Sequence, residues 1–247
     1  MKDEKLISIL CPTHKRPELQ TRFAYYVYEN CSNPENCEIV FGIDSDDEVA
    51  IETANKLKKR CKGDFISICL VEPNQKRLSD IVNLCATAAR GEILGTAADD
   101  VIFRSENWDL TILEEFNKFE DKIMLLWSDD GLWGAQLASH YFVHKNWIRA
   151  VGHAQPSHFY ADWTDHWIQR LALKLGRAVP VRDRQRLFLE HMHAEHGGME
   201  KDETYYKVKE RRDKNNTEGI NIDSPELKRI HDAEYEKLKN FIDNYGK

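Results

Sequence analysis

Residues 78–100 read LSDIVNLCATAARGEILGTAADD. Apolar residues recur at helical spacing through residues 78–89, which predicts a helix with one buried face. After Gly91, the apolar pair Ile93-Leu94 begins a buried strand, and two carboxylates, Asp99 and Asp100, follow it. The stretch therefore predicts a helix that leads into a strand, with acidic side chains at the carboxyl end of that strand.

The same alternation of helix and strand extends on both sides of this stretch. Short apolar runs predict further strands, and amphipathic segments predict further helices. Ser45 is the expected N-cap of the second helix, and residues 131–162 are expected to form one long functional loop around a short strand. The pattern is that of a mainly parallel α/β sheet with helices on both faces. The expected strands lie at 6–11, 38–43, 65–71, 123–127 and 141–143, and the expected helices at 17–27, 45–57, 163–175 and 225–242.

The overall composition indicates a globular protein. The 247 residues include 42 Asp and Glu against 35 Lys and Arg, which gives a net charge of -7, and 41% of the residues are hydrophobic. This acidity argues against a protein that coats nucleic acid, so no nucleic-acid partner is expected. No apolar run approaches the roughly 20 residues of a transmembrane helix, and the N-terminal stretch lacks the features of a signal peptide. A cytoplasmic location is therefore expected.

All six cysteines lie within the first 85 residues, and none forms a CxxC motif. Their spacing does not match that of a zinc finger or knuckle. Reduced thiols are predicted, as is usual in cytosolic proteins, with a disulfide between Cys31 and Cys37 as the alternative.

Polar clusters follow the predicted strands where each strand ends. In an open parallel sheet, ligands bind at the carboxyl ends of the strands. Residues 13–16 and 72–77 contribute basic side chains, whereas residues 44–47 and the pair Asp99-Asp100 are acidic. Adjacent carboxylates at such an edge suit a hard divalent cation that also accepts phosphate oxygens. The mixture therefore favours a metal-bound phosphate compound. Asp129-Asp130 is a rival acidic pair. It ranks lower, because it lies in a turn and no comparable motif precedes it.

Three ordered blocks resemble family 2 glycosyltransferases. Residues 7–17, ISILCPTHKRP, resemble the first strand and nucleotide loop of that family, and residues 41–47, FGIDSDD, resemble its second strand with a terminal Asp. Residues 78–100 resemble its metal-binding block. One departure is that the usual earlier Asp of this block is replaced by Ala97 or Ala98. The resemblance implies a GT-A-like, Rossmann-like fold with a mainly parallel sheet.

The resemblance also assigns roles to single residues. A later block, residues 158–176, resembles the family's acidic motif at the start of a helix, which supplies the general base; Asp162 is the expected base and Asp165 the alternative. A late histidine in the segment 187–196 is expected to complete the metal site, with His193 chosen over His191. The implied nucleotide-binding residues are Pro12, Thr13, His14, Arg16, Asp44, Arg77 and Asp99, and the implied ligands of Mn²⁺ or Mg²⁺ are Asp99, Asp100 and His193.

The sequence as a whole predicts a metal-dependent, inverting glycosyltransferase of the hexosyltransferase type. The donor would be a nucleoside-diphosphate sugar, with a UDP-sugar favoured, and the acceptor a glycan or another hydroxyl compound. Among the aromatic residues, Trp133 and Phe159 are expected to stack on sugar rings. A nucleotidyltransferase and a non-catalytic nucleotide- or glycan-binding module are the alternatives; the first is disfavoured because residues 12–17 contain no glycine.

Three segments describe the expected domain organisation. Residues 1–199 form the catalytic domain, with a nucleotide-binding half at 1–104 and an acceptor half at 105–199. Residues 200–247 form a charged C-terminal helical extension.

Overall fold

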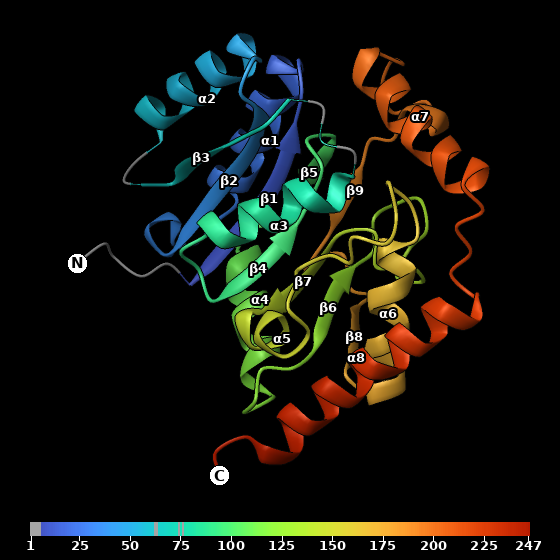
Figure 1. Cartoon of the computed structure of the whole chain (residues 1–247). Helices are drawn as coiled ribbons and strands as arrows, with labels where there is room; N and C mark the ends of the chain where they lie inside the picture. Colours follow the sequence, from blue (N-terminus) through green and yellow to red (C-terminus); the bar gives the residue numbers. More distant parts are fainter. Residues whose placement is uncertain (1–5, 62–63, 74, 76) are drawn as a thin grey trace.

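A seven-stranded mixed sheet forms the centre of the chain, with the strand order β3-β2-β1-β4-β7-β6-β8 (Figure 1). The computed structural model describes residues 6–61, 64–73, 75 and 77–247. Strands β1 to β4 are parallel, β7 is antiparallel to both of its neighbours, and β6 and β8 are parallel. The strands are β1 (Ile7–Thr13), β2 (Cys37–Asp44), β3 (Ile66–Val71), β4 (Ile93–Thr96), β6 (Leu125–Ser128), β7 (Tyr141–His144) and β8 (Ala178–Val181).

A second, two-stranded sheet lies beside the point where β4 ends. It pairs β5 (Val101–Phe103) with β9 (Leu189–His191) in antiparallel orientation, so that Val101 faces His191. Because β5 begins directly after Asp99-Asp100, this small sheet brings a histidine from late in the sequence next to the two carboxylates.

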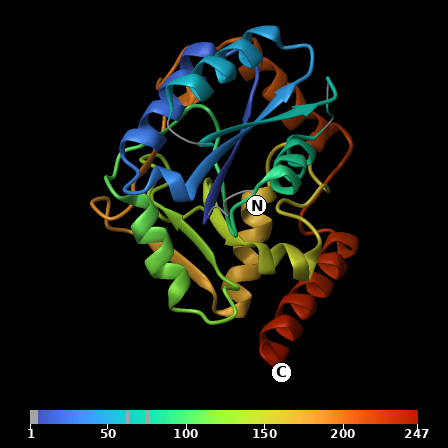
Figure 2. The same ribbon diagram turned by 90° about the vertical axis from the view of Figure 1, so that its left-hand side faces the viewer.

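Helices cover both faces of the main sheet, and Figure 2 shows α1, α2 and α4 on one side and α3 and α8 on the other. Within the described residues there are eight α-helices and two short 3-10 helices. The helices are α1 (Pro17–Glu29), α2 (Glu48–Arg60), α3 (Leu78–Ala88), α4 (Trp108–Asn117), α5 (Lys145–Val151), α6 (Thr164–Leu175), α7 (Glu203–Thr217) and α8 (Pro225–Asn244), with η1 (Pro34–Asn36) and η2 (Ala194–His196).

The period-two alternation of β1 explains the two layers. Ile7, Ile9 and Cys11 join the buried cluster that includes Phe23 of α1 and Trp108 of α4. Leu10 points to the other face, into the cluster formed with α3. A strand that is apolar on both faces is typical of a sheet covered on both sides, and the predicted α/β fold is confirmed.

Two details of the sequence prediction are wrong. The N-cap of α2 is Asp47 and not Ser45, because the helix begins at Glu48 and the Asp47 carboxylate accepts a hydrogen bond from the Ala50 N–H. The segment 131–162 contains α5 as well as a strand, because the His144 imidazole accepts the Asn146 N–H and starts a helix there.

The two C-terminal helices have different roles in the fold. Helix α8 has Ser224 as its N-cap, as its Ser-Pro-Glu start predicted, and its apolar face packs into the cluster formed with α5 and α6. Helix α7 instead crosses the end of the sheet where β1 and β2 finish, and the Thr204 hydroxyl there donates to the His14 carbonyl oxygen (2.6 Å). No helix in the described part of the chain is both long enough and apolar enough to cross a membrane.

A buried carboxylate ties the strands of the nucleotide-binding half together. Glu38 on β2 is fully buried and accepts hydrogen bonds from Ser8 (2.7 Å), from Ser67 (2.9 Å) and from the backbone and guanidinium of Arg90 (2.6 and 2.9 Å). Burial raises the pKa of Glu38, but these hydrogen bonds lower it by a larger amount. The pKa of Glu38 therefore lies below its ordinary value. Glu38 therefore stabilises the fold in its charged form.

We expect Glu38→Gln to lower the free energy of unfolding by about 2–3 kcal/mol at neutral pH, because it removes charge-assisted hydrogen bonds. Since the folded-state pKa is the lower one, this stabilisation exists above the unfolded-state pKa of about 4.3 and is lost as the pH falls through the folded-state value. Denaturant unfolding of both proteins at neutral and acidic pH measures the difference. A difference that persists unchanged in acid would contradict this account.

Candidate active site

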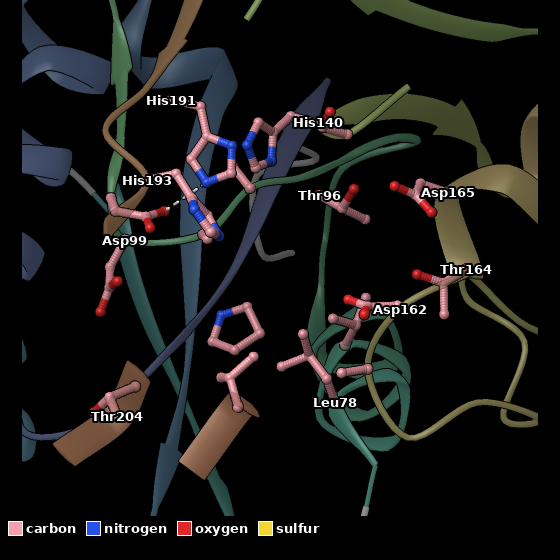
Figure 3. Close-up of a pocket in the computed structure, with 18 of the residues that line it drawn as sticks. Leu78, Thr96, Asp99, His140, Asp162, Thr164, Asp165, His191, His193 and Thr204 are labelled. Carbon is pink, nitrogen blue, oxygen red and sulfur yellow. Dashed lines mark ion pairs between the residues drawn. The ribbon is translucent and has the colours of Figure 1, made fainter. Parts of the chain in front are cut away.

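A cavity of about 530 Å³ opens at the carboxyl ends of β1, β2 and β4 (Figure 3). This volume is within the range of small-molecule sites. Residues from stretches far apart in the sequence meet there, as the sheet-edge rule predicted. Of the predicted site residues, the lining includes Pro12, Thr13, His14, Arg16, Asp44, Asp99, Asp100, Asp162 and His193, together with the two alternatives His191 and Asp165.

Asp99 is held by the last residue of β1 and by the loop that follows it. The Thr13 hydroxyl donates to Asp99 Oδ2 (2.7 Å), and Arg16 Nη1 donates to Asp99 Oδ1 (3.0 Å). Burial, together with the charge of Asp100, raises the pKa of Asp99 to about 6, while Arg16 and Thr13 oppose this rise. Both carboxylate oxygens of Asp99 are therefore engaged by the loop that was predicted to bind the nucleotide.

Asp100 has a buried carboxylate oxygen close to His191. Its Oδ1 is buried and accepts no hydrogen bond from any described residue, and it lies 3.5 Å from Nε2 of His191. Burial raises the pKa of Asp100, but the imidazoles of His191 and His140 and the guanidinium of Arg16 lower it to about 2. Asp100 is thus a buried anion with one lone-pair direction that the protein leaves open.

Three histidines gather on one wall of the cavity (Figure 3), and His191 among them lies 3.5 Å from Asp100. The ring of His191 lies 4.7 Å from that of His140 and 5.0 Å from that of His193. Burial and the neighbouring His191 lower the pKa of His140 to about 3, and burial lowers that of His193 as well. Neutral imidazoles of this kind are suited to bind a metal.

The residues at this wall fit a divalent metal ion. The unpartnered buried atoms are Asp100 Oδ1, His191 Nδ1 and His140 Nε2, and an oxygen and nitrogen donor set suits Mn²⁺ or Mg²⁺. The donor atoms do not form a compact triad, since no three of them lie within 4.8 Å of one another among the described residues. Both histidines that the sequence left open are present, His191 at the end of β9 and His193 as the N-cap of η2.

Asp162 lies on the opposite wall, near Asp165 (Figure 3). Helix α6 begins at Thr164, after Trp163 with a left-handed φ of 75°. Asp162 therefore lies in the loop just before the helix, and Asp165 lies in the first turn of the helix. A non-glycine residue with positive φ is strained, and such strain is concentrated at functional sites.

Arg212 of α7 is the direct partner of Asp162. Its Nε donates to Asp162 Oδ1 (2.9 Å), and its Nη2 lies 3.4 Å from His193 Nε2. Burial raises the pKa of Asp162 above its ordinary value, while Arg212 opposes the rise. Asp165 is instead bound by its neighbour His166, whose backbone N–H and ring nitrogen lie 2.8 and 2.9 Å from Asp165 Oδ1.

Helix α7 supplies a basic wall that the sequence prediction missed. Lys207 Nζ lies 3.1 Å from Asp44 Oδ2, and Arg211 also lines the cavity. At the start of the helix, Asp202 accepts two hydrogen bonds from Arg16 (2.6 and 2.7 Å). The charges after residue 200 are nearly balanced, so the composition gave no sign that basic residues face the cavity.

Two predicted residues lie elsewhere. Arg77 does not line the cavity, and its guanidinium stacks over the ring of Tyr160 at 5.1 Å. Phe159 is fully buried and packs edge-on against Trp167 at 5.7 Å, so the expectation that it stacks on a sugar is wrong. Trp133 does line the cavity and is 52% exposed.

Comparison with solved structures identifies the fold. The S. aureus TarS structure superposes with a TM-score of 0.60 at 11% identity, covering 98% of this chain and 44% of TarS. TarS 1-349 in complex with UDP-GlcNAc gives 0.59 at 14% identity, covering 97% of this chain and 73% of that one. The mannosyltransferase PcManGT from Pyrobaculum calidifontis, in complex with GDP-Man and Mn²⁺, gives 0.61 at 13% identity, covering 98% and 74%.

These likenesses confirm the GT-A-like fold that the sequence resemblance implied. The chain spans less than half the length of TarS. No protein-family model matches the sequence, and no curated protein matches it.

Proposed function

We propose that the chain is a family 2-like glycosyltransferase that transfers a sugar from a nucleoside-diphosphate sugar to an acceptor hydroxyl, with inversion at the anomeric carbon. One observation carries the proposal: Asp44, the pair Asp99-Asp100 and Asp162 line one cavity at the carboxyl edge of a GT-A-like sheet. Solved structures of the same fold are complexes with GDP-Man and Mn²⁺ or with UDP-GlcNAc. A UDP-sugar is the favoured donor and a hexose the favoured group.

The nucleotide would lie along β1 and β2. Asp44, at the end of β2, would accept hydrogen bonds from the base or the ribose, and its neighbours His14 and Lys207 hold it in place (3.3 and 3.1 Å). Thr13 and Arg16 would orient Asp99 toward the nucleotide. The basic side chains of α7 face the same space, where the diphosphate would carry its negative charge.

Asp100 and His191 would hold the divalent cation, with Asp99 and His193 beside them. Mn²⁺ or Mg²⁺ bound there would offset the negative charge that develops on the departing nucleoside diphosphate. The proposal is supported by the buried Asp100 Oδ1, which accepts no hydrogen bond from a described residue, and by the lowered pKa of His140 beside it.

Asp162 would act as the general base. It lies across the cavity from the metal wall, so it would take the proton of a hydroxyl that attacks the anomeric carbon from the side opposite the leaving diphosphate. This placement supports inversion. Arg212 would keep Asp162 ionised until the substrates are bound.

Calorimetric titration of the purified chain with UDP and with GDP, each with and without Mn²⁺, tests the donor site. We expect one of the two nucleotides to bind in a Mn²⁺-dependent manner. Incubation of the matching sugar nucleotides with a panel of methyl glycosides and alditols, followed by anomeric analysis of the product, then tests transfer and inversion. Binding without turnover of any sugar nucleotide would indicate the non-catalytic module, and a retained configuration would contradict the role of Asp162.

Trp133 is the more exposed of the two tryptophans that line the cavity, and it would stack on the acceptor. We expect Trp133→Ala to raise the acceptor KM about two- to tenfold, because an aromatic contact contributes about 0.5–1.5 kcal/mol. Neither kcat nor the nucleotide Kd should change. Tyr25→Ala is the control, since Tyr25 is comparably exposed (50%) but lies outside the cavity. An unchanged acceptor KM would remove Trp133 from this role.

A further inference from the structure

Two cysteines and an aspartate meet at the end of the sheet opposite the cavity. Cys31 follows α1, Cys37 begins β2, and Asp109 lies in the first turn of α4. The two sulfur atoms are 3.5 Å apart, and all three side chains are buried, with exposed fractions of 8%, 1% and 2%. Within the described parts of the chain, this is the one group of three such residues whose donor atoms all lie within 4.8 Å of one another.

The separation of the two sulfur atoms fits coordination to one metal ion. Zinc binds thiolate sulfur at about 2.3 Å in a tetrahedron, which places two such sulfur atoms about 3.8 Å apart. A disulfide requires about 2.05 Å, so the observed 3.5 Å is much closer to the metal-binding distance. Reduced thiols at this position agree with the sequence prediction, and both cysteines are free.

Asp109 is already oriented by the loop between the cysteines. Its carboxylate accepts hydrogen bonds from the Ser32 N–H (2.8 Å), the Ser32 hydroxyl (2.6 Å) and the Asn33 N–H (3.1 Å). Hydrogen bonds of this kind fix the direction of a ligating carboxylate in metal sites. One of its roughly four lone-pair sites stays open for a metal.

Binding of a divalent ion leaves the net charge of this buried site unchanged. When two thiols bind a divalent metal, two protons leave and two positive charges arrive. The net charge of the group, set by the Asp109 carboxylate, is therefore the same before and after binding. The thiolate ligands select a soft or borderline ion such as Zn²⁺ over Mg²⁺.

We propose that Cys31, Cys37 and Asp109 form a binding site for a thiophilic divalent metal ion such as Zn²⁺, with water as the fourth ligand. The site clips the end of α1, the start of β2 and the start of α4 together. The site is also connected to the cavity through Asn30, the neighbour of Cys31. Asn30 donates to the Phe103 carbonyl oxygen (2.6 Å) and accepts from the Asn107 N–H (2.7 Å), and both partners lie in the segment that follows Asp99-Asp100.

Cobalt titration of the full chain tests the proposal independently of any enzymatic activity. Co²⁺ bound to thiolates gives a sulfur-to-metal charge-transfer absorption that histidine and carboxylate sites do not give. The reduced, chelator-treated protein is titrated with Co²⁺ and then with Zn²⁺, in an Asp100→Ala/His191→Ala background so that the cavity does not compete. We expect one equivalent of Co²⁺ with the charge-transfer band, which Zn²⁺ displaces.

Variants assign the absorption to these residues. The band should vanish in Cys31→Ser and in Cys37→Ser, and Asp109→Asn should weaken cobalt binding about 10- to 100-fold. Cys69→Ser/Cys85→Ser is the matched control and should keep the band. Absence of the band in the parent protein, or its persistence in Cys37→Ser, would overturn the proposal. So would conversion of the pair to a disulfide by oxidised glutathione, with release of two molecules of reduced glutathione, in a protein that binds no Co²⁺.

Discussion

Asp162→Asn should reduce sugar transfer about 10²- to 10⁴-fold, the contribution expected of a general base. Asparagine keeps the shape of the side chain and a hydrogen-bonding oxygen, but it has no affinity for the acceptor proton. Donor binding does not use this group, so the calorimetric Kd of the nucleoside diphosphate in the presence of Mn²⁺ should stay the same. Because the pKa of Asp162 is raised, the wild-type rate should fall on the acid side at a pH above the ordinary aspartate value.

Asp165→Asn provides the matched comparison three residues away. Asp165 also lines the cavity, but its carboxylate is bound by the backbone N–H and the ring nitrogen of His166. We expect this variant to keep most of the transfer rate. If Asp165→Asn instead loses turnover and Asp162→Asn keeps it, the two roles are exchanged. If both keep it, the cavity contains no aspartate base.

The fold was predictable because its signals are local. Strand β1 is apolar on both faces, α3 has a clear apolar stripe, and the start of α8 has its cap residues in order. Each of these patterns depends on residues within about one element length. The edge where β1, β2 and β4 end follows from that order of elements, so the nucleotide loop and the acidic pair could be placed together before the structure was known.

The rest of the cavity depends on contacts that no local pattern encodes. His140 lies just before β7 and His191 ends β9, and they meet because β9 pairs with β5. Lys207 and Arg212 lie on a helix whose surface composition is that of an ordinary solvated helix, yet they pair with Asp44 and Asp162, which precede them by 163 and 50 residues. Conversely, Phe159 looked exposed because its segment has little periodicity, and the packing of Trp167 against it could not be read from the sequence.

Asp100→Ala should remove the metal-dependent part of nucleotide binding. Asp100 is the buried anion whose Oδ1 has no hydrogen-bond donor among the described residues, so a cation is the partner that best satisfies it. We expect the increase in UDP or GDP affinity on adding Mn²⁺ to be smaller than in the wild type by a factor on the order of 100. Such a loss is at the upper end of that caused by removing residues that support a metal site. The weaker affinity measured without Mn²⁺ should change little, because Asp44, Thr13 and His14 are intact.

Asp129→Ala is the control that separates this effect from a general loss of acidic charge. Asp129 belongs to the rival acidic pair, but its carboxylate is bound by Arg184 (2.9 and 3.0 Å) and does not line the cavity. Both variants remove one negative charge, and only one removes it from beside His191. Equal losses of Mn²⁺-dependent affinity in the two variants would mean that the metal responds to net charge and not to a site. A loss confined to Asp100→Ala, together with an unchanged melting temperature, would assign the metal to the wall formed by Asp100 and the histidines.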